Sequence, residues 1–333
     1  MIRAAIAGLG WWGQNLVRAV AGSGAIRIQA ACTRNRDAAA AFCAEQGLAW
    51  TSDFDAVLRD PAIDAVVLAT PHSAHTDQIA RAAAAGKHVF VEKPFALTVA
   101  DARASIAAAE RARVVLGVGF NRRFHPSMAL MKRAMAERVG TVAALSAEQT
   151  ALHGLALTPE SWRAWRTESP GGAMTAIGVH LVDGMIDLNG RIAEVYARVS
   201  RRAAVEADDT TDILLRFENG ASGHIFCSTA STPTYRMAAH GTGGMAEILG
   251  HPMATFRMVP AIAGEHRLTG APETTETPGF NMLTAELEEF AAAIAAGRPF
   301  RTPLAEVLHG VEVFEAVLES ARTGRPEPVR ASA

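Results

Sequence analysis

The sequence predicts an α/β protein that begins with a doubly wound parallel sheet and continues into an α+β domain with a large, mainly antiparallel sheet. The chain has 333 residues, more than one hydrophobic core usually serves. Up to about residue 120, near-continuous apolar runs alternate with alanine-rich amphipathic stretches, which is typical of parallel strands buried on both faces. After Phe120 the apolar runs are longer and alternate with polar residues, as half-exposed antiparallel strands do.

The first part is expected to form strands and helices in strict alternation. Strands are predicted from Ile2, Ile26, Asp64, His88 and Val114, with a short extended piece at Trp50. Helices are predicted over residues 14–21, 37–46, 75–85 and 99–111. Right-handed crossovers between such strands produce a doubly wound sheet.

The second part is expected to be a sheet flanked by a few helices. Strands are predicted from Thr141, Ile192, Asp209, Ala221 and Tyr235, and helices over 126–137, 282–296 and 303–321. Asn219-Gly220 is a hairpin signal between two of these strands. We therefore divide the chain into residues 1–120, a dinucleotide-binding domain, and 121–333, a substrate-binding and oligomerisation domain. Whether the last helix packs back on the first domain stays open, and the tail from Gly324 is expected to be loosely held.

Composition excludes several classes of protein. Apolar residues make up 49% and charged residues 20%, as in ordinary globular proteins, and a net charge of −2 argues against a nucleic-acid partner. Cys32, Cys43 and Cys227 form no CxxC pair, so neither a disulfide scaffold nor a cysteine zinc site is expected. No export signal or membrane-spanning run is recognisable. We expect a cytoplasmic protein with a small-molecule partner and no metal.

A glycine-rich turn follows the first predicted strand. Gly8, Gly10 and Gly13 form a GxGxxG pattern with Trp11 and Trp12 between the second and third glycines. These glycines permit a tight turn, a close approach to a pyrophosphate and close helix packing, and the helix N-terminus faces the anion. The position between a strand and a helix indicates a Rossmann dinucleotide site that includes both tryptophans.

The end of the second strand bears on which dinucleotide binds. NAD sites usually have an acidic residue there, whereas this chain has Thr33 and Arg34. A hydroxyl followed by Arg suits a 2′-phosphate, so NADP is preferred and NAD remains possible. The alternative is that Arg34 and Arg36 are solvated loop charges.

Two further motifs follow buried strands, where ligands of such sheets bind. Glu92, Lys93 and Pro94 form one of them, and only 3 of the 32 basic residues are lysines (Lys87, Lys93 and Lys132). An ammonium at this position can hydrogen-bond a substrate hydroxyl, although a Glu92–Lys93 surface pair is the structural alternative. The other motif is formed by Thr70, Pro71, His72 and His75, and for His75 a surface position at the helix start is equally expected.

A fourth motif is Gly171-Gly172 followed by His180 and Asp183. Residues three apart share one face of a helix, so His180 and Asp183 are expected to lie together. Histidine is the natural proton acceptor near neutral pH.

Together these motifs resemble the glucose–fructose oxidoreductase/inositol dehydrogenase family, often written Gfo/Idh/MocA. The resemblance spans nearly the whole chain and rests on AGLGWWG, ATPHSAH, VEKPFALT, GFNRRFHP, WRTESPGGAM and GTGGMAEI, in this order. It implies a Rossmann domain and an open-faced sheet domain through which homodimers or homotetramers form. It also implies NAD(P)-dependent hydride transfer on sugars, cyclitols, dihydrodiols or related compounds.

By this resemblance Lys93 contacts the reacting hydroxyl and His180 is the catalytic histidine, with Asp183 as a further catalytic candidate. The family usually has Asp four residues before that histidine, whereas this chain has Ala176. Two alternatives to a dehydrogenase therefore remain. One is a redox-inactive nucleotide-binding or regulatory protein, and the other is a lyase or hydrolase that uses the nucleotide transiently.

Substrate contacts are expected from the two segments that follow the first domain. They are Asn121, Arg122, Trp165 and Arg166, together with His180. With Arg123, Arg163 and Trp162 nearby in sequence, these residues suit a carboxylate-bearing or aromatic ligand. Ordinary ion pairs and a tryptophan core are the alternative.

Overall fold

The structure is a computed structural model that describes residues 1–262 and 269–330, and it divides into two compact units. The first unit comprises Met1–Asn121 and Asn281–Leu308, and the second comprises Arg122–Phe280 and His309–Ala333. The first boundary therefore lies within one residue of the expected position. The segment 281–308, which the sequence analysis assigned to the second domain, belongs to the first unit instead.

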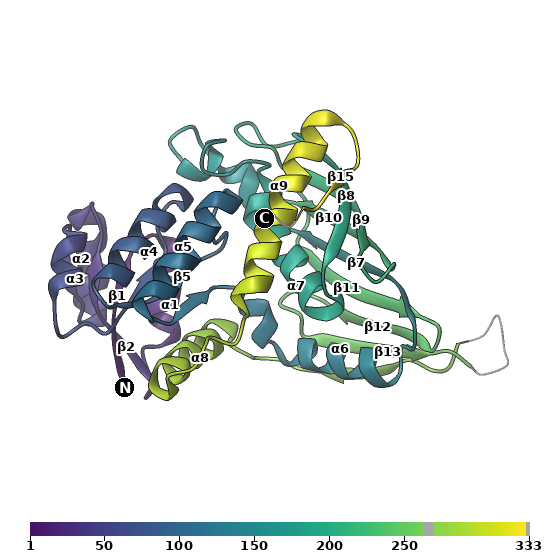
Figure 1. Cartoon of the computed structure of the whole chain (residues 1–333), viewed down its shortest axis with the longest axis horizontal. Coiled ribbons are helices and arrows are strands. Elements are labelled where there is room, and N and C mark those ends of the chain that lie inside the picture. The colour runs from purple at the N-terminus through teal and green to yellow at the C-terminus, as the bar shows by residue number, and fades with distance from the viewer. Residues whose placement is uncertain (263–268, 331–333) are drawn as a thin grey trace. The chain divides into compact units, whose positions relative to one another are not determined.

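The first unit contains a six-stranded parallel sheet in the order β3-β2-β1-β4-β5-β6. This is the strand order of the dinucleotide-binding Rossmann fold, whose direction of winding reverses between β1 and β4. Figure 1 labels β1, β2 and β5 of this sheet. The strands are β1 (Ile2–Ala7), β2 (Ile26–Cys32), β3 (Ala49–Thr51), β4 (Ala65–Leu68), β5 (His88–Val91) and β6 (Leu116–Val118). The helices are α1 (Trp11–Ala19), α2 (Arg36–Gln46), α3 (Phe54–Arg59), α4 (His75–Ala84) and α5 (Val99–Ala112).

Helix α8 (Met282–Ala296) completes this unit from the far end of the sequence. It contacts α1, β1, β2 and β5. The ring of Phe290 lies 5.6 Å from that of Phe90 in β5, and Gly117 of β6 leaves room for both rings. The question left open for the last helix is decided differently: most of α9 (Leu304–Thr323) belongs to the second unit, and the preceding helix α8 belongs to the first.

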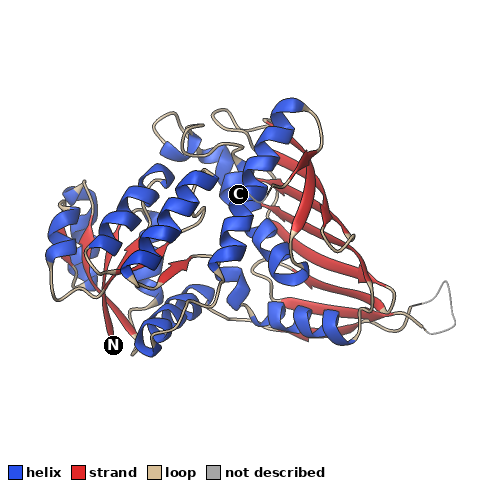
Figure 2. Cartoon of the chain, in the orientation of Figure 1, coloured by secondary structure: helices blue, strands red, loops and turns tan. Residues whose placement is uncertain are grey.

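The second unit is built on a nine-stranded sheet in the order β14-β13-β12-β11-β7-β10-β9-β8-β15. All its neighbouring strands are antiparallel except the pair β7 and β10. Helices α6 (Pro126–Glu137) and α7 (Val179–Asn189) pack on one face of this sheet, and Figure 2 shows the other face without helices. The strands are β7 (Val142–Thr150), β8 (Ile192–Ser200), β9 (Thr210–Phe217), β10 (Ser222–Ser228), β11 (Thr234–Gly241), β12 (Gly244–Leu249), β13 (Thr255–Pro260), β14 (Glu273–Glu276) and β15 (Glu327–Pro328).

Several elements escaped the sequence analysis. Helix α3 and strands β12, β13 and β14 were not predicted, because short or polar segments carry a weak periodic signal. The tail is partly ordered, since Glu327 and Pro328 pair with β8. Its last residues, 331–333, lie outside the described part.

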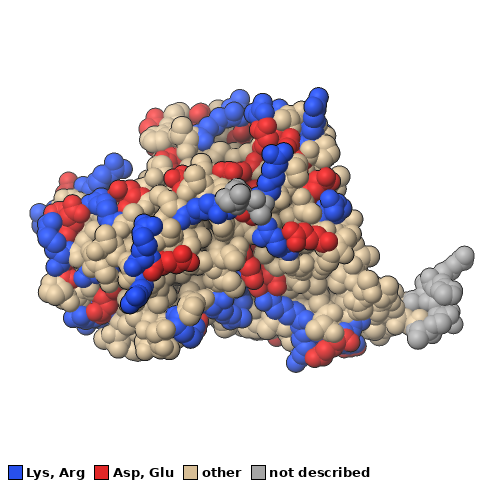
Figure 3. Space-filling view, in the orientation of Figure 1, with Lys and Arg blue, Asp and Glu red and all other residues tan. Residues whose placement is uncertain are grey.

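Charged side chains are mixed over the face in view in Figure 3. Many of them form exposed ion pairs, such as Arg298 with Glu289 and Arg138 with Glu273. No helix among the described residues is long and apolar enough to cross a membrane. The three cysteines are free and buried.

Candidate cofactor site and active-site residues

The predicted cofactor motifs of the first unit gather at the carboxyl ends of its parallel strands. The glycine turn follows β1, Thr33 and Arg34 follow β2, the segment from Thr70 to His75 follows β4, and Glu92 and Lys93 follow β5. Parallel strands end at the same edge of a sheet, so one edge carries all these residues.

Close packing explains two of the three glycines in the turn, and open space explains the third. A Cβ on Gly8, which has φ +90°, would lie 2.4 Å from the carbonyl oxygen of Ala69. A Cβ on Gly13 would lie 2.1 Å from the carbonyl oxygen of Gly8, whereas nothing lies within 4 Å of a Cβ on Gly10. Gly10 therefore leaves a free approach to the backbone, as a bound pyrophosphate requires.

The N-terminus of α1 has the properties of an anion site. Gly10 is its N-cap, and no side chain caps the helix. The amide N–H groups of the first turn are thus left to a ligand or solvent, and the helix dipole favours a negative charge there. Trp11 is 74% exposed and its ring lies 5.5 Å from that of Trp12, whose buried indole N–H has no acceptor among the described residues. These features fit a dinucleotide pyrophosphate.

Arg34 and Arg36, which follow β2 and which the sequence analysis did not distinguish, differ in their contacts. Arg36 lies over the ring of Trp50, 5.2 Å from its centroid. Arg34 is exposed and forms no ion pair with any residue that the structure describes. Asp37, the nearest acid in sequence, is exposed in the first turn of α2. Of the two arginines, Arg36 thus contacts an aromatic ring, whereas Arg34 is exposed.

His75 lies in the interior, so its surface alternative is wrong. It is fully buried at the start of α4. Its Nδ1 lies 3.1 Å from the carbonyl oxygen of Pro94, and its Nε2 lies 3.2 Å from that of Thr70. His75 thus joins the loop after β4 to the loop that follows Lys93. The hydroxyl of Thr70 donates to Gln78, and the His72 ring lies edge-on to that of His75.

Glu92 is a buried residue, so the expected alternative of an exposed pair at the surface does not describe its position. It is 5% exposed, and its Oε2 accepts the backbone N–H of Lys93 at 3.3 Å. Gly119 on the neighbouring chain segment lies directly against its carboxyl group, because a Cβ there would be 3.0 Å from Oε1. The backbone of Lys93 is therefore held by the preceding side chain.

His180 lies in the second unit, in the first turn of α7, and is 6% exposed. The expected entry through two glycines is present, with φ +72° at Gly171 and +47° at Gly172. A Cβ on Gly172 would lie 1.7 Å from the carbonyl oxygen of Asp208. Between this turn and α7 the chain forms a π-helix, Met174–Gly178, which contains Ala176. π-helical turns are rare in proteins, and those that occur are often found at functional sites.

Asp183 is engaged in a buried ion pair that the sequence analysis did not foresee. Nε of Arg123 lies 2.9 Å from one of its carboxylate oxygens, and Nη2 lies 2.6 Å from the other. Arg123 also contacts Asp187, which pairs with Lys132. A carboxylate that binds a guanidinium at both oxygens serves to position residues more readily than to accept a proton.

Arg122 lies over the ring of Tyr235, with Cζ 5.3 Å from the centroid. Burial lowers the pKa of Arg122 to about 10, and burial raises that of Tyr235 to about 12. The buried Nη1 of Arg122 has no acceptor among the described residues. A buried donor without an acceptor is costly, so Arg122 is suited to bind a ligand oxygen. Asn121, just before it in sequence, is 7% exposed and belongs to the first unit.

The other expected substrate residues lie at the surface of the second unit. Trp165 is 49% exposed, and its indole N–H donates to the carbonyl oxygen of Pro159. Arg166 forms an exposed ion pair with Asp208, and Arg163 stacks on Trp162. For Arg166 these contacts favour the ordinary ion pair over the binding interpretation.

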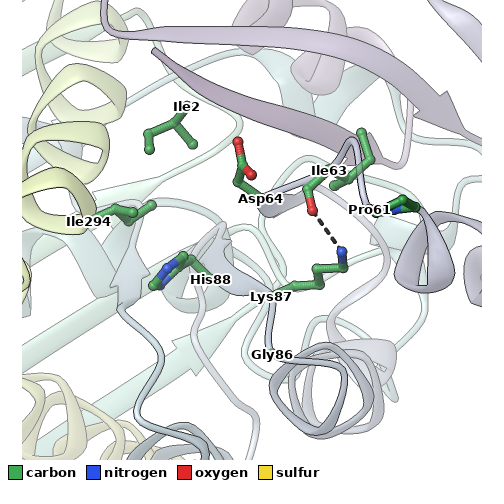
Figure 4. A pocket seen from close by; sticks show the side chains of 8 residues that line it. All are labelled: Ile2, Pro61, Ile63, Asp64, Gly86, Lys87, His88 and Ile294. Carbon is green, nitrogen blue, oxygen red and sulfur yellow. Dashed lines mark hydrogen bonds between the residues drawn. The ribbon is translucent and has the colours of Figure 1, made fainter.

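A surface depression of about 480 Å³ lies at the opposite edge of the first sheet (Figure 4). It is lined by the amino-end residues of three strands and by α8, including Ile2, Asp64, His88 and Ile294. Nζ of Lys87 donates to the carbonyl oxygen of Ile63 beside it. Ligands of open parallel sheets bind at the carboxyl ends of the strands, so this depression is not the cofactor site.

Sequence reasoning missed several residues of these regions. Tyr235 and Glu286 gain their importance from partners distant in sequence, so no local spacing reveals them. Arg123 was named, but its pairing with Asp183 was not predicted. Gly119 was part of a quoted motif, but its position against Glu92 required the neighbouring strand.

The fold and the cofactor edge define a nicotinamide-dinucleotide oxidoreductase. Residues 2–120 match the family described as "Oxidoreductase family, NAD-binding Rossmann fold", and residues 128–247 match the "GFO/IDH/MocA C-terminal domain". The chain belongs to the Gfo/Idh/MocA family of NAD(P)-dependent oxidoreductases, as its motifs predicted.

Similar proteins extend over nearly the full chain. The 1,5-anhydro-D-fructose reductase of Ensifer adhaerens is 29% identical over 330 residues, which covers 94% of this chain and 93% of the relative. The scyllo-inositol 2-dehydrogenase (NAD(+)) of Bacillus subtilis (strain 168) is 27% identical and covers 98% and 95%. A levoglucosan dehydrogenase in complex with NADH and L-sorbose has the same fold, with a TM-score of 0.90 at 23% identity over 99% of each chain.

Proposed function

We propose that this protein is an NADP-preferring oxidoreductase that interconverts a secondary alcohol and a carbonyl group on a sugar, a cyclitol, a dihydrodiol or a related small molecule. The observation that carries the proposal is the position of Lys93, which follows β5 at the sheet edge that also bears the glycine turn. The names of the two relatives above, a sugar reductase and an inositol dehydrogenase, support this range of substrates.

The cofactor would be held by the glycine turn and by the loops after β2, β4 and β5. When bound, its nicotinamide accepts or supplies the hydride. Nζ of Lys93 hydrogen-bonds the reacting oxygen and stabilises the negative charge that develops there. The imidazole of His180 takes the hydroxyl proton during oxidation and returns it during reduction.

Asp183 acts in this proposal as a positioning residue. Its pairing with Arg123 supports this role, since both carboxylate oxygens contact the guanidinium. The family pattern has Asp one helical turn before the catalytic histidine, where this chain has Ala176. We therefore expect slower proton transfer than in family members with that Asp.

The preference for NADP rests on Arg34. It is exposed, it forms no ion pair in the described part of the chain, and no acid follows β2 until Asp37. A guanidinium binds a phosphate through two parallel hydrogen bonds, which a ribose hydroxyl cannot accept in the same way. Titration of nucleotide-stripped protein with NADPH and NADH, followed by nicotinamide fluorescence, tests this preference.

Substrate oxygens are proposed to contact Arg122 first, with Asn121, Trp165 and His180 as further contacts. Arg166 is left out of this proposal because it pairs with Asp208. The buried and unsatisfied Nη1 of Arg122 supports its role most strongly. A carboxylate or a hydroxyl can both accept a hydrogen bond from it, so a substrate panel should include sugar acids beside neutral polyols.

Turnover of such a panel, followed by nicotinamide absorbance, tests the function. Wild type should turn over at least one member, and Lys93→Ala should lower kcat by about 10²–10⁴-fold while nucleotide binding is retained. Equal turnover in Lys93→Ala would contradict the assignment. Ala176 favours a second candidate function, in which the protein binds the nucleotide without net oxidation of a substrate. Tight nucleotide binding without turnover of any compound in the panel would indicate this second function.

We further propose that the chain forms a homodimer or homotetramer through the helix-free face of the large sheet. Leu214, on β9, is 58% exposed and lies opposite Tyr196 of β8, which is 38% exposed. Exposed apolar side chains on an uncovered sheet face are typical of an interface. Leu214→Glu should lower the mass measured by light scattering to that of a smaller assembly, and an unchanged mass would contradict the proposal.

A further inference from the structure

One buried carboxyl group of the first unit is not used by the proposed chemistry. Glu286 of α8 is completely buried, and neither of its carboxylate oxygens receives a hydrogen bond from any described residue. An ionised carboxylate without donors in such surroundings is very costly. A protonated carboxyl group costs much less and also provides one O–H donor.

The packing of α8 on the first sheet identifies the neighbour of Glu286. Ile294 and His88 line the same depression at the amino edge of the sheet (Figure 4). One helical turn earlier, Phe290 packs against Phe90. α8 therefore runs antiparallel to β5. Residues nearer the N-terminus of α8 lie nearer the carboxyl end of β5.

The same spacing, continued by one helical turn of α8 and two residues of the strand, brings the carboxyl groups of Glu286 and Glu92 together. Four helical residues span about 6 Å, and two strand residues span about 6.6 Å. Glu286 precedes Phe290 by one turn, and Glu92 follows Phe90 on the same face of the strand. Gly117 and Gly119 on the adjacent segment make room for the rings and for the Glu92 carboxyl group, respectively. Glu286 thus lies beside Glu92.

We propose that Glu286 is kept as a neutral carboxylic acid that donates its proton toward the Glu92 carboxylate, and that this pair positions Lys93. Glu92 in turn accepts the backbone N–H of Lys93. Removal of the Glu286 donor would take one contact from the Glu92 carboxyl group and so weaken the support that its Oε2 gives to the Lys93 backbone. Glu286 is a positioning residue, since it is too deeply buried to meet a substrate.

The electrostatic surroundings agree with a neutral acid. Burial, and secondarily the Glu92 carboxylate, raise the pKa of Glu286 well above its ordinary value. On α8 itself, Glu288 accepts a hydrogen bond from Ser23 and Glu289 pairs with Arg298. The other titratable groups on the elements packed against α8 are Arg18, which lies over Phe42, Arg3, which pairs with Asp64, and Arg27, Cys32 and His88.

The neutral acid is tested by stability as a function of pH, without any substrate. Above the ordinary pKa of Glu the unfolded chain ionises while folded Glu286 keeps its proton, so the native state binds more protons and its stability falls as pH rises. Relative to Glu286→Gln, the folding constant of wild type should fall about tenfold per pH unit until the folded pKa is reached. Glu289→Gln removes a carboxylate of the same helix that is half-buried and pairs with Arg298, and its stability should depend on pH as that of wild type does above the ordinary pKa of Glu. The proposal would be overturned if the folding constants of wild type and Glu286→Gln changed equally with pH.

The positioning of Lys93 is tested by lysine labelling, because the chain has only three lysines. Glu286→Gln keeps a donor and should label at Lys93 like wild type with an amine reagent, quantified by mass spectrometry. Glu286→Leu lacks the donor and should change the labelling rate of Lys93 alone, with Lys87 and Lys132 as internal controls. An unchanged Lys93 rate in a folded Glu286→Leu protein would overturn the positioning role.

The kinetic consequence rests on the proposed function of Lys93. With an active substrate, Glu286→Leu should lower kcat by about 10- to 100-fold at an unchanged affinity for NADPH, and Glu286→Gln should restore it. Wild-type kcat in Glu286→Leu would contradict the positioning role. If wild type itself turns over nothing, the proposed function fails while the stability and labelling measurements still decide the role of Glu286.

Discussion

Gly13 in the first unit and Gly172 in the second are both required by a backbone carbonyl at close range, but the carbonyls come from different distances along the chain. Gly13 faces the carbonyl oxygen of Gly8 in its own turn, whereas Gly172 faces that of Asp208, which precedes strand β9. The first requirement belongs to a local motif that can be recognised from spacing alone. The second arises only when a distant loop packs against the segment that leads to His180.

The largest effect expected from this comparison is on stability. Gly172→Ala places a methyl group on the carbonyl oxygen of Asp208 at a positive φ, and should cost about 3–5 kcal/mol of the free energy of unfolding. Gly10→Ala is the matched control, because open space surrounds its Cβ and its φ is −71°. It should unfold at nearly the wild-type urea concentration but bind NADPH more weakly. Equal urea midpoints for Gly172→Ala and wild type would contradict this account.

A second pair of variants separates positioning from catalysis in the second unit. Asp183→Asn removes the buried charge that pairs with Arg123 and should destabilise the fold by about 3 kcal/mol. His180→Asn should leave the urea midpoint nearly unchanged and lower kcat by about 100-fold or more. Both quantities are measured on each variant. A fully stable Asp183→Asn protein with a large loss of kcat would assign Asp183 to catalysis instead.

The arginines after β2 offer a smaller effect in the first unit. Arg34→Ala should weaken NADPH binding by about 10- to 100-fold, which corresponds to one charge-assisted hydrogen-bonding group, and should leave NADH binding unchanged. Arg36→Ala, which removes the contact with Trp50, serves as the control and should affect both nucleotides equally. Equal losses for both nucleotides in Arg34→Ala would favour NAD as the cofactor.

The smallest expected effect concerns Ala176. Ala176→Asp introduces the carboxylate of the family pattern one turn before His180 and should stabilise the imidazolium. The acid limb of the kcat profile should then move to higher pH, with a few-fold change in kcat at neutral pH. The measurement is the pH dependence of kcat in the variant and in wild type. An unchanged profile would show that the π-helix directs residue 176 away from the imidazole.

Features that depend on local sequence could be predicted, whereas features that depend on contacts distant in sequence could not. Apart from helix α3, the order of strands and helices up to residue 120 was predictable, because buried parallel strands appear in the sequence as apolar runs between helical patterns. The cofactor edge followed, since parallel strands end at one edge of a sheet. The burial of His75 was not predictable, because its Nδ1 contacts the carbonyl oxygen of Pro94, which lies in a loop that only the sheet brings close.

The second unit shows the limits more clearly. The hairpin at Asn219-Gly220 was correctly predicted from two residues, and it joins β9 to β10. The short strands β13 and β14 and the pairing of Glu327 with β8 had no such signal. Pairing between distant strands depends on the register of a whole sheet, which no short window of sequence contains.

The sequence by itself determined the Rossmann topology, the glycine turn, the lysine after β5 and the family to which the chain belongs. These features depend on residues within one motif or on the periodicity of one element. Only the tertiary structure decided that Glu286 lies beside Glu92, that Asp183 pairs with Arg123 and that Gly172 faces Asp208. The reason is physical: a buried charge or a close backbone contact is defined by its partner, and folding selects that partner from elsewhere in the chain.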